Sequence, residues 1–224
     1  GNTGGVVHML GDQVALDKGA KINATGKRGG GEVLMGGDYK GGAYSKTIEA
    51  GKHGRMLELN YAKNGGIQKA RKLYLDKDAF TDVSALDVGN GGRAILWSDE
   101  LTKFLGTIKA TGGAASGNGG FIETSSKEIL TALGTADASA AHGTAGTWLL
   151  DPHNIIISTG ADGANTSITT TAGPPKRFDT NASNATLTTG SIETALNGGT
   201  SVIVETSVPG ADAGNITVAN NISK

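Results

Sequence analysis

Apolar residues along this chain fall into short, β-branched runs that are bounded by glycine and asparagine. Strands separated by tight turns have this signature. The runs are "VVHML" (6–10), "EVLM" (32–35), "RAILW" (93–97), "GFIET" (120–124), "TWLLD" (147–151), "NIIIS" (154–158), "SVIVET" (201–206) and "NITVAN" (215–220). The pattern therefore predicts a chain made mostly of short strands.

The strongest apolar run surrounds a rigid turn in "GTWLLDPHNIIIS" (146–158). The stretch would suit a catalytic pocket wall, a cofactor clamp or one unit of a repeat. The repeats described next favour the last interpretation. We expect "TWLL" to be an inward-facing strand, Asp151-Pro152 a corner and "NIII" the following side. Trp148 is then a core residue rather than a ligand-stacking one.

Four segments share one order: an alternating strand, a Gly/Asn-rich turn and a second apolar strand. They are 22–35, 83–97, 108–123 and 136–150. Gly92 and Gly120 are 28 residues apart, and Gly120 and Gly146 are 26 apart. Two further matches pair "LGTIKA" (105–110) with "LGTADA" (133–138) and "LDKGAKINA" (16–24) with "LDKDAFTDVSA" (75–85). Strand-rich repeats of this length predict an all-β parallel β-helix (β-solenoid), whose coils stack about 4.8 Å apart.

Two segments depart from the repeat. Residues 191–197 predict a short helix, with Ser191 as its cap, Glu193 in the first turn and Gly198 and Gly199 at its end. Residues 159–190 are poor in apolar side chains and predict a loop-rich excursion. The expected organisation is β-helix coils over 1–158, the excursion over 159–190, and the helix with further β-helix strands over 191–224. Both chain ends look like strands, so we expect a piece of a longer rod or end-to-end stacking of copies.

Composition adds few chemical candidates. The chain has 224 residues, 37 of them glycine, no cysteine and a net charge of −1. This charge gives no global attraction to nucleic acid, so no nucleic-acid partner is expected. The four histidines, His8, His53, His142 and His153, do not occur at metal-ligand spacing. We therefore expect no metal site and no cofactor.

Catalytic motifs are not evident either. No nucleophile elbow or Walker loop occurs, and "GNGGRA" (89–94) precedes a strand rather than the helix that a phosphate site requires. The carboxylates of Asp76, Asp78 and Asp82, and those of Asp99 and Glu100, are expected to solvate turns. The expectation is that the chain is not an enzyme.

One basic stretch, residues 43–74, is the candidate binding region. Its cations outnumber its two acidic residues, Glu49 and Glu58, while the rest of the chain is net negative. Such a stretch would attract sulfated or sialylated glycans, or an acidic protein face, and two tyrosines would stack on sugars. A solvated outer face is the alternative. The candidate residues are Lys46, Lys52, Arg55, Lys63, Lys69, Arg71, Lys72, Tyr44 and Tyr61.

Asn-X-Ser/Thr sequons form a second set of candidates, as glycosylation acceptors. They begin at Asn23, Asn165, Asn181, Asn184, Asn215 and Asn221. In a chain this rich in threonine, several sequons are also expected by chance.

Several motifs of this chain resemble those of one family. They lie at 64–79, 89–113, 117–129 and 146–158, and the likeness continues through "GPPKRF…TLTTGSIETALNGGTSVIVET" (173–206). The family is that of the large exoproteins of bacterial two-partner secretion, the filamentous-haemagglutinin-like group, and within it the high-molecular-weight adhesins. The resemblance implies a right-handed β-helix that is secreted through an outer-membrane transporter partner and displayed on the cell surface. It also implies glycosylation at sequons. The Asn-Pro-Asn motifs of the family's secretion domain are missing, so the chain resembles the region after that domain.

Three functions are compatible with this resemblance. The first is a segment of a secreted surface adhesin that attaches to a host cell-surface glycan or protein. The second is a nutrient-capture exoprotein that binds a host haem carrier through 159–190. The third is a structural unit of a surface filament.

Overall fold

The computed structural model of the protein describes residues 2–42, 67–159, 185–206 and 214–224. These residues form an all-β fold of parallel sheets, with one α-helix within the described ranges. The prediction of a parallel, mostly β chain is confirmed.

Three sheets, which we name A, B and C, contain strands that are paired in parallel throughout. Sheet A consists of β1 (Val6–Met9), β4 (Glu32–Met35), β7 (Arg93–Leu96), β10 (Phe121–Thr124), β13 (Thr147–Leu150) and β16 (Ser201–Val204). Sheet B runs in the order β2 (Gln13–Leu16), β5 (Lys72–Leu75), β8 (Leu101–Phe104), β11 (Ile129–Ala132), β15 (Ala185–Thr188), β14 (Ile155–Ser158) and β17 (Ile216–Val218). Sheet C consists of β3 (Lys21–Asn23), β6 (Phe80–Asp82), β9 (Thr107–Lys109) and β12 (Thr135–Asp137).

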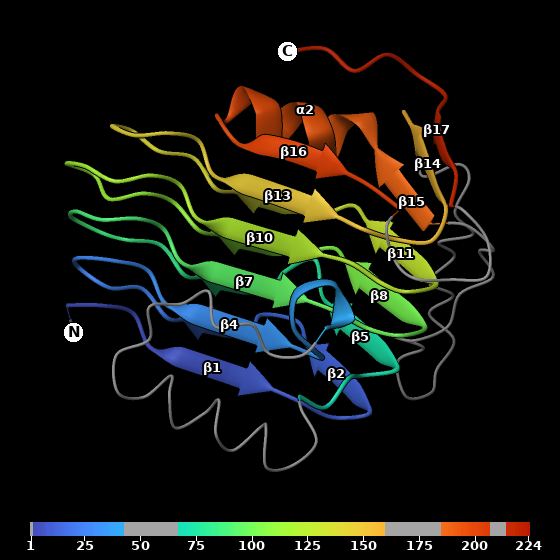
Figure 1. Cartoon of the computed structure of the whole chain (residues 1–224), viewed down its shortest axis with the longest axis horizontal. Helices are drawn as coiled ribbons and strands as arrows, with labels where there is room; N and C mark the ends of the chain where they lie inside the picture. The colour runs from blue at the N-terminus through green and yellow to red at the C-terminus, as the bar shows by residue number, and fades with distance from the viewer. Residues whose placement is uncertain (1, 43–66, 160–184, 207–213) are drawn as a thin grey trace.

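The chain visits the sheets in the order A, B, C four times, and we call each passage a layer. Layers 1 to 4 are β1–β3, β4–β6, β7–β9 and β10–β12. Figure 1 shows the strands of sheet A stacked from β1, in blue near the N-terminus, to β16 in red. The sequence repeats predicted the register: Phe121 pairs with Arg93 and with Thr147, Thr107 pairs with Thr135, and Leu16 pairs with Leu75.

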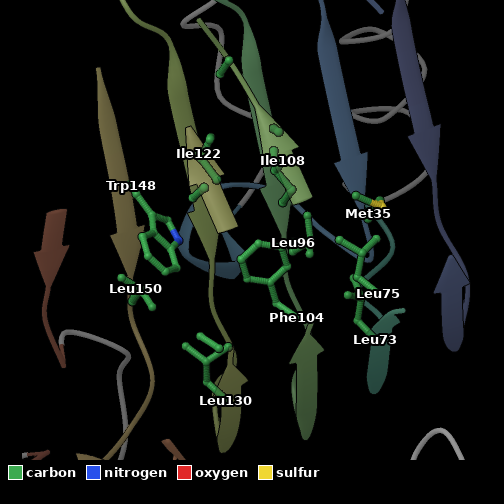
Figure 2. Packing of buried hydrophobic residues seen from close by; sticks show 14 of the residues in the cluster. Met35, Leu73, Leu75, Leu96, Phe104, Ile108, Ile122, Leu130, Trp148 and Leu150 are labelled. Atoms are coloured by element: carbon green, nitrogen blue, oxygen red, sulfur yellow. The ribbon is translucent and has the colours of Figure 1, made fainter. Parts of the chain in front are cut away.

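The main core lies between the sheets and is filled by alternate residues of each strand, because successive side chains of a strand point to opposite faces. Figure 2 shows Met35, Leu96, Ile122 and Trp148 among these buried side chains. Trp148 has none of its surface exposed, and its indole N–H donates to Thr124 Oγ1 at 3.0 Å. Its ring packs edge-to-face with that of Phe104, with ring centroids 6.1 Å apart. The prediction that Trp148 is a core residue is confirmed.

The stacking order changes after β13. The predicted corner at Asp151-Pro152 is present, and Pro152 bridges to Ser126. Strand β14 follows it, but it does not pair with β11, the corresponding strand of layer 4. Instead, β15 pairs with both β11 and β14. The order of neighbours in sheet B therefore departs from the order of the chain at this point.

Helix α2 (Thr189–Asn197) lies beside β16 (Figure 1) and packs against β12, which is the last strand of sheet C among the described residues. It buries Ile192 and Ala195. The predicted helix is present, but its N-cap is Thr188 rather than Ser191: Thr188 Oγ1 accepts from Ser191 N–H at 3.1 Å. Residues 185–190 of the predicted excursion thus belong to β15 and α2, and residues 160–184 lie outside the described ranges.

A short segment, residues 36–42, leaves β4 and lies on the face of sheet A that points away from the main core. We call it the strap; it contains a single 3₁₀ turn, η1 (Tyr39–Gly41). Beneath it, Leu34, Ile95 and Trp97 form a second buried apolar cluster with Ile67. Gly41 has φ +62°, and a Cβ there would lie 2.3 Å from the Trp97 ring, so only glycine fits.

Candidate functional site

The predicted basic stretch is described only at its C-terminal end. Lys46, Lys52, Arg55, Lys63, Tyr44 and Tyr61 lie outside the described residues. Of the three described cations, Lys69 and Arg71 are exposed, and Lys72 is half-buried at the start of β5. The binding role of this stretch stays a prediction.

Arg71 joins three layers through ion pairs. Its guanidinium forms a fork with Asp12 of layer 1, at 2.8 and 2.9 Å, and contacts Glu100 of layer 3 at 3.2 Å. The hydrogen bond from Arg71 holds the pKa of Asp12 below its ordinary value. Lys69 lies 3.9 Å from Asp99. Lys69 and Arg71 therefore have acidic partners, which reduces their attraction for an anionic ligand.

Of the other acidic groups noted in the sequence, Asp76 and Asp78 lie at a turn, as expected, whereas Asp82 is the last residue of β6. Asp76 accepts from the Tyr74 hydroxyl at 2.7 Å and from Asp78 N–H at 3.0 Å. Asp82 accepts from Ser84 N–H at 2.9 Å. Among the described residues, no group of three or more histidine, cysteine or carboxylate side chains is arranged to hold a metal ion.

Three of the six sequons have an asparagine within the described ranges. Asn23, at the end of β3, is exposed, and its Oδ1 accepts from both the N–H and the hydroxyl of Thr25. Asn215 is exposed and donates to Asn154 Oδ1 at 3.4 Å, and Asn221 is exposed near the C-terminus. Asn165, Asn181 and Asn184 lie outside the described residues. Glycosylation at these six sequons stays a prediction.

A buried ionic cluster under the strap was not anticipated from the sequence. Glu32 of β4 and Arg93 of β7 are register partners in sheet A, on the face away from the core. Glu32 is 1% exposed; it accepts from Arg93 at 3.1 Å and lies 2.6 Å from His8 Nε2. Arg93 also forms an ion pair with the fully buried Asp38 of the strap.

The cluster continues across the later strands through Lys40. The backbone N–H of Lys40 donates to Glu123 Oε1 of β10 at 3.0 Å. Its ammonium lies 2.7 Å from Glu205, which follows β16, and 4.0 Å from the buried Asp151, which follows β13. Partial burial acts to lower the pKa of Lys40, but its hydrogen bond and attraction to Glu205 raise that pKa overall.

Glu123 is the unusual member of this cluster. Burial raises its pKa to about 8, with a further contribution from Asp151; hydrogen bonds from Lys40 N–H and Ser125 and the charge of Arg93 oppose the rise. Its Oε2 is buried and has no hydrogen-bond partner within the described residues. The side chain is therefore mainly a neutral acid at neutral pH, and it accepts a hydrogen bond from the strap.

A sequence signal for this cluster exists, but it is weak. Glu32, Arg93 and Glu123 occupy outward positions in successive apolar strands, where repeats normally place solvated residues. Burial of these positions depends on the strap, and the path of the strap is not encoded by a local pattern.

Comparison with protein-family models and with curated proteins finds no match to this chain. Within the described ranges, no helix combines the length and the apolar character needed to cross a membrane.

Proposed function

We propose that this chain is a segment of a secreted bacterial surface adhesin, built as a right-handed parallel β-helix. Two facts support the β-helix: the chain passes four times through three parallel sheets in the same order, and its layers repeat in register every 26 to 29 residues where no insertion intervenes. Crossovers between parallel strands of one sheet are right-handed in about 98% of cases, which supports the hand.

The functional proposal rests on the position of the adhesin-like motifs in the fold. "GNGGRAILW", "GNGGFIET" and "GTWLLDPHNIIIS" correspond to β7, β10 and the pair β13–β14, which are strands of one continuous stack. The resemblance to two-partner secretion exoproteins is thus concentrated in the scaffold. A rod of this kind leaves its outer faces available for attachment to a host glycan or protein.

Within this proposal, the part of the basic stretch before residue 67 is the binding element. Lys69 and Arg71 have acidic partners from neighbouring layers, so they are poor candidates for an anionic ligand. Lys46, Lys52, Arg55 and Lys63 then supply the positive charge, and sulfated or sialylated glycans are the expected ligands.

The test compares two charge-reversal variants on a glycan array and on host cells. The first changes Lys46, Lys52, Arg55 and Lys63 to Glu. The matched control changes four exposed cations of layer 1 and its following turn, Lys18, Lys21, Lys27 and Arg28, to Glu. Both variants alter the net charge equally, so a general charge effect is cancelled.

We expect wild type and the control to bind sulfated or sialylated glycans, and the first variant to lose at least tenfold in affinity. Equal loss in both variants would indicate non-specific attraction. An absence of binding by wild type would reject an adhesive role for this segment and leave it a spacer.

A further inference from the structure

Contacts in a stack of repeats are normally limited to adjacent layers. In the three sheets, each strand of the first four layers pairs only with the strand before or after it in the stack. Such arrays behave as a chain of nearest-neighbour interactions, and their ends open before their middles. A contact between distant layers would change this behaviour.

The strap makes contacts of that kind. It begins in layer 2, directly after β4, and Asp38 pairs with Arg93 of layer 3. Tyr39 packs on Phe121 of layer 4, with ring centroids 5.9 Å apart, and Lys40 N–H donates to Glu123 of the same strand. The Lys40 ammonium then contacts Asp151 and Glu205, at the ends of β13 and β16. Contacts from three consecutive residues, Asp38, Tyr39 and Lys40, therefore reach from layer 2 across sheet A to the end of its last strand.

The backbone of the strap is held in an unfavourable conformation to make these contacts. Lys40 has φ 50° and ψ 32° and is the one non-glycine residue with positive φ among the described residues. Non-glycine residues rarely adopt this left-handed conformation, and they keep it only where surrounding contacts fix it. Here it lets the Lys40 N–H point into the sheet at Glu123 while the side chain reaches Glu205.

The underlying surface is shaped to receive the strap. Gly41 lies against the ring of Trp97, and the Trp97 indole N–H donates to Asp99 Oδ1 at 3.2 Å, which fixes the ring. The polar partners below are buried: Glu123 and Asp151 have no exposed surface, and Arg93 has 11% of its side chain exposed. Displacing the strap would remove the Asp38 partner of Arg93, the hydrogen bond from Lys40 N–H to Glu123 and the Lys40 ammonium beside Asp151. Arg93 would keep only its pair with Glu32 among these contacts.

We propose that the strap is a staple that couples layer 2 to β13 and β16, so that the C-terminal layers open together with the middle of the stack rather than before it. Lys40 is the residue that closes the staple. This inference rests on the stacked-layer organisation of the proposed function and is independent of adhesion. A negative glycan-binding result would therefore leave the staple proposal intact, and a negative hydrogen-exchange result would leave the adhesion proposal intact.

The test is native-state hydrogen exchange of the full chain, followed by mass spectrometry of peptides, in Lys40→Ala and wild type. Lys77→Ala is the matched control, because it removes a lysine–carboxylate pair of 2.9 Å that stays within one turn. We expect Lys40→Ala to speed exchange in β13 and β16 at least tenfold while peptides of β2 and β5 change less than twofold. Lys77→Ala should leave β13 and β16 unchanged.

Two results would overturn the proposal. One is an unchanged exchange rate in β13 and β16 of Lys40→Ala; the other is an equal acceleration in every layer, which would indicate ordinary global destabilisation. Glu205→Gln provides an independent check of the same contact. It should speed exchange in β16 in the same direction, and the double variant should add little to Lys40→Ala, because both changes remove one interaction.

Discussion

Glu123 places a buried carboxyl group beside a second buried carboxyl group, that of Asp151. A charged carboxylate in this position would lose its hydration, so the neutral acid is favoured in the folded chain. Because the unfolded chain restores the ordinary pKa of 4.5, folding binds a proton between that value and about 8. Stability conferred by this site therefore falls as pH rises through that window.

Replacing Glu123 with Gln removes the ionisation but keeps an oxygen that accepts the Lys40 N–H. We expect Glu123→Gln to unfold at about the same urea concentration as wild type at pH 5, and to be more stable by a few kcal/mol, as an order of magnitude, at pH 8.5. Urea unfolding at several pH values measures this. Glu128→Gln, at an exposed surface position, serves as control. If the unfolding free energies of wild type and Glu123→Gln changed with pH in parallel, the raised pKa of Glu123 would be contradicted.

Gly117 shows how closely successive turns approach. Its φ is +128°, and a Cβ at this position would lie 1.8 Å from the carbonyl oxygen of Gly89 in the preceding turn. We expect Gly117→Ala to destabilise the fold by about 2 kcal/mol or more, because backbone cannot yield as a side chain can. At Gly5 an added Cβ meets nothing within 4 Å, so Gly5→Ala should change thermal stability little. A similar effect of both substitutions would contradict this account of close stacking.

At the scale of elements, helix α2 depends on its first residues. The Thr188 hydroxyl accepts from Ser191 N–H and satisfies a donor that the helix itself leaves open. We expect Thr188→Ala to cost about 1 kcal/mol in unfolding free energy. Thr194→Ala, on the exposed face of α2, should be neutral or slightly stabilising, since alanine favours helix. Denaturant unfolding measures the free energy of unfolding of both variants. An equal decrease in the two would contradict the role of Thr188 as N-cap.

The apolar runs predicted the strands of sheet A together with β14 and β17, and they predicted the inward position of Trp148. The helix was predicted from different signals, a hydroxyl residue at its start and two glycines at its end, and Gly198 and Gly199 end it as expected. The sequence pattern fits an N-cap hydroxyl at Thr188 and at Ser191 equally well. Only the entry of the chain from β15 decides between Thr188 and Ser191.

Across the whole molecule, the repeats predicted which residues stack, since Arg93, Phe121 and Thr147 share one row of sheet A. They did not predict which strand stacks on which after β13. Periodicity determines the face of a strand but not its neighbour, and "ATLT" of β15 is too polar to be recognised as a buried strand. The buried charges under the strap were missed for a related reason: their burial comes from a non-local contact.

The position of β14 in sheet B also affects the time course of folding. A protein is synthesised from its N-terminus, and each strand of layers 2 to 4 emerges when its earlier neighbour is complete. Strand β14 is different, because both of its neighbours, β15 and β17, come later in the chain. When β14 emerges, the last completed strand of sheet B is β11, and the free edge of β11 later pairs with β15. A strand with three consecutive isoleucines thus waits for its lasting neighbours until residue 188 and beyond have been made.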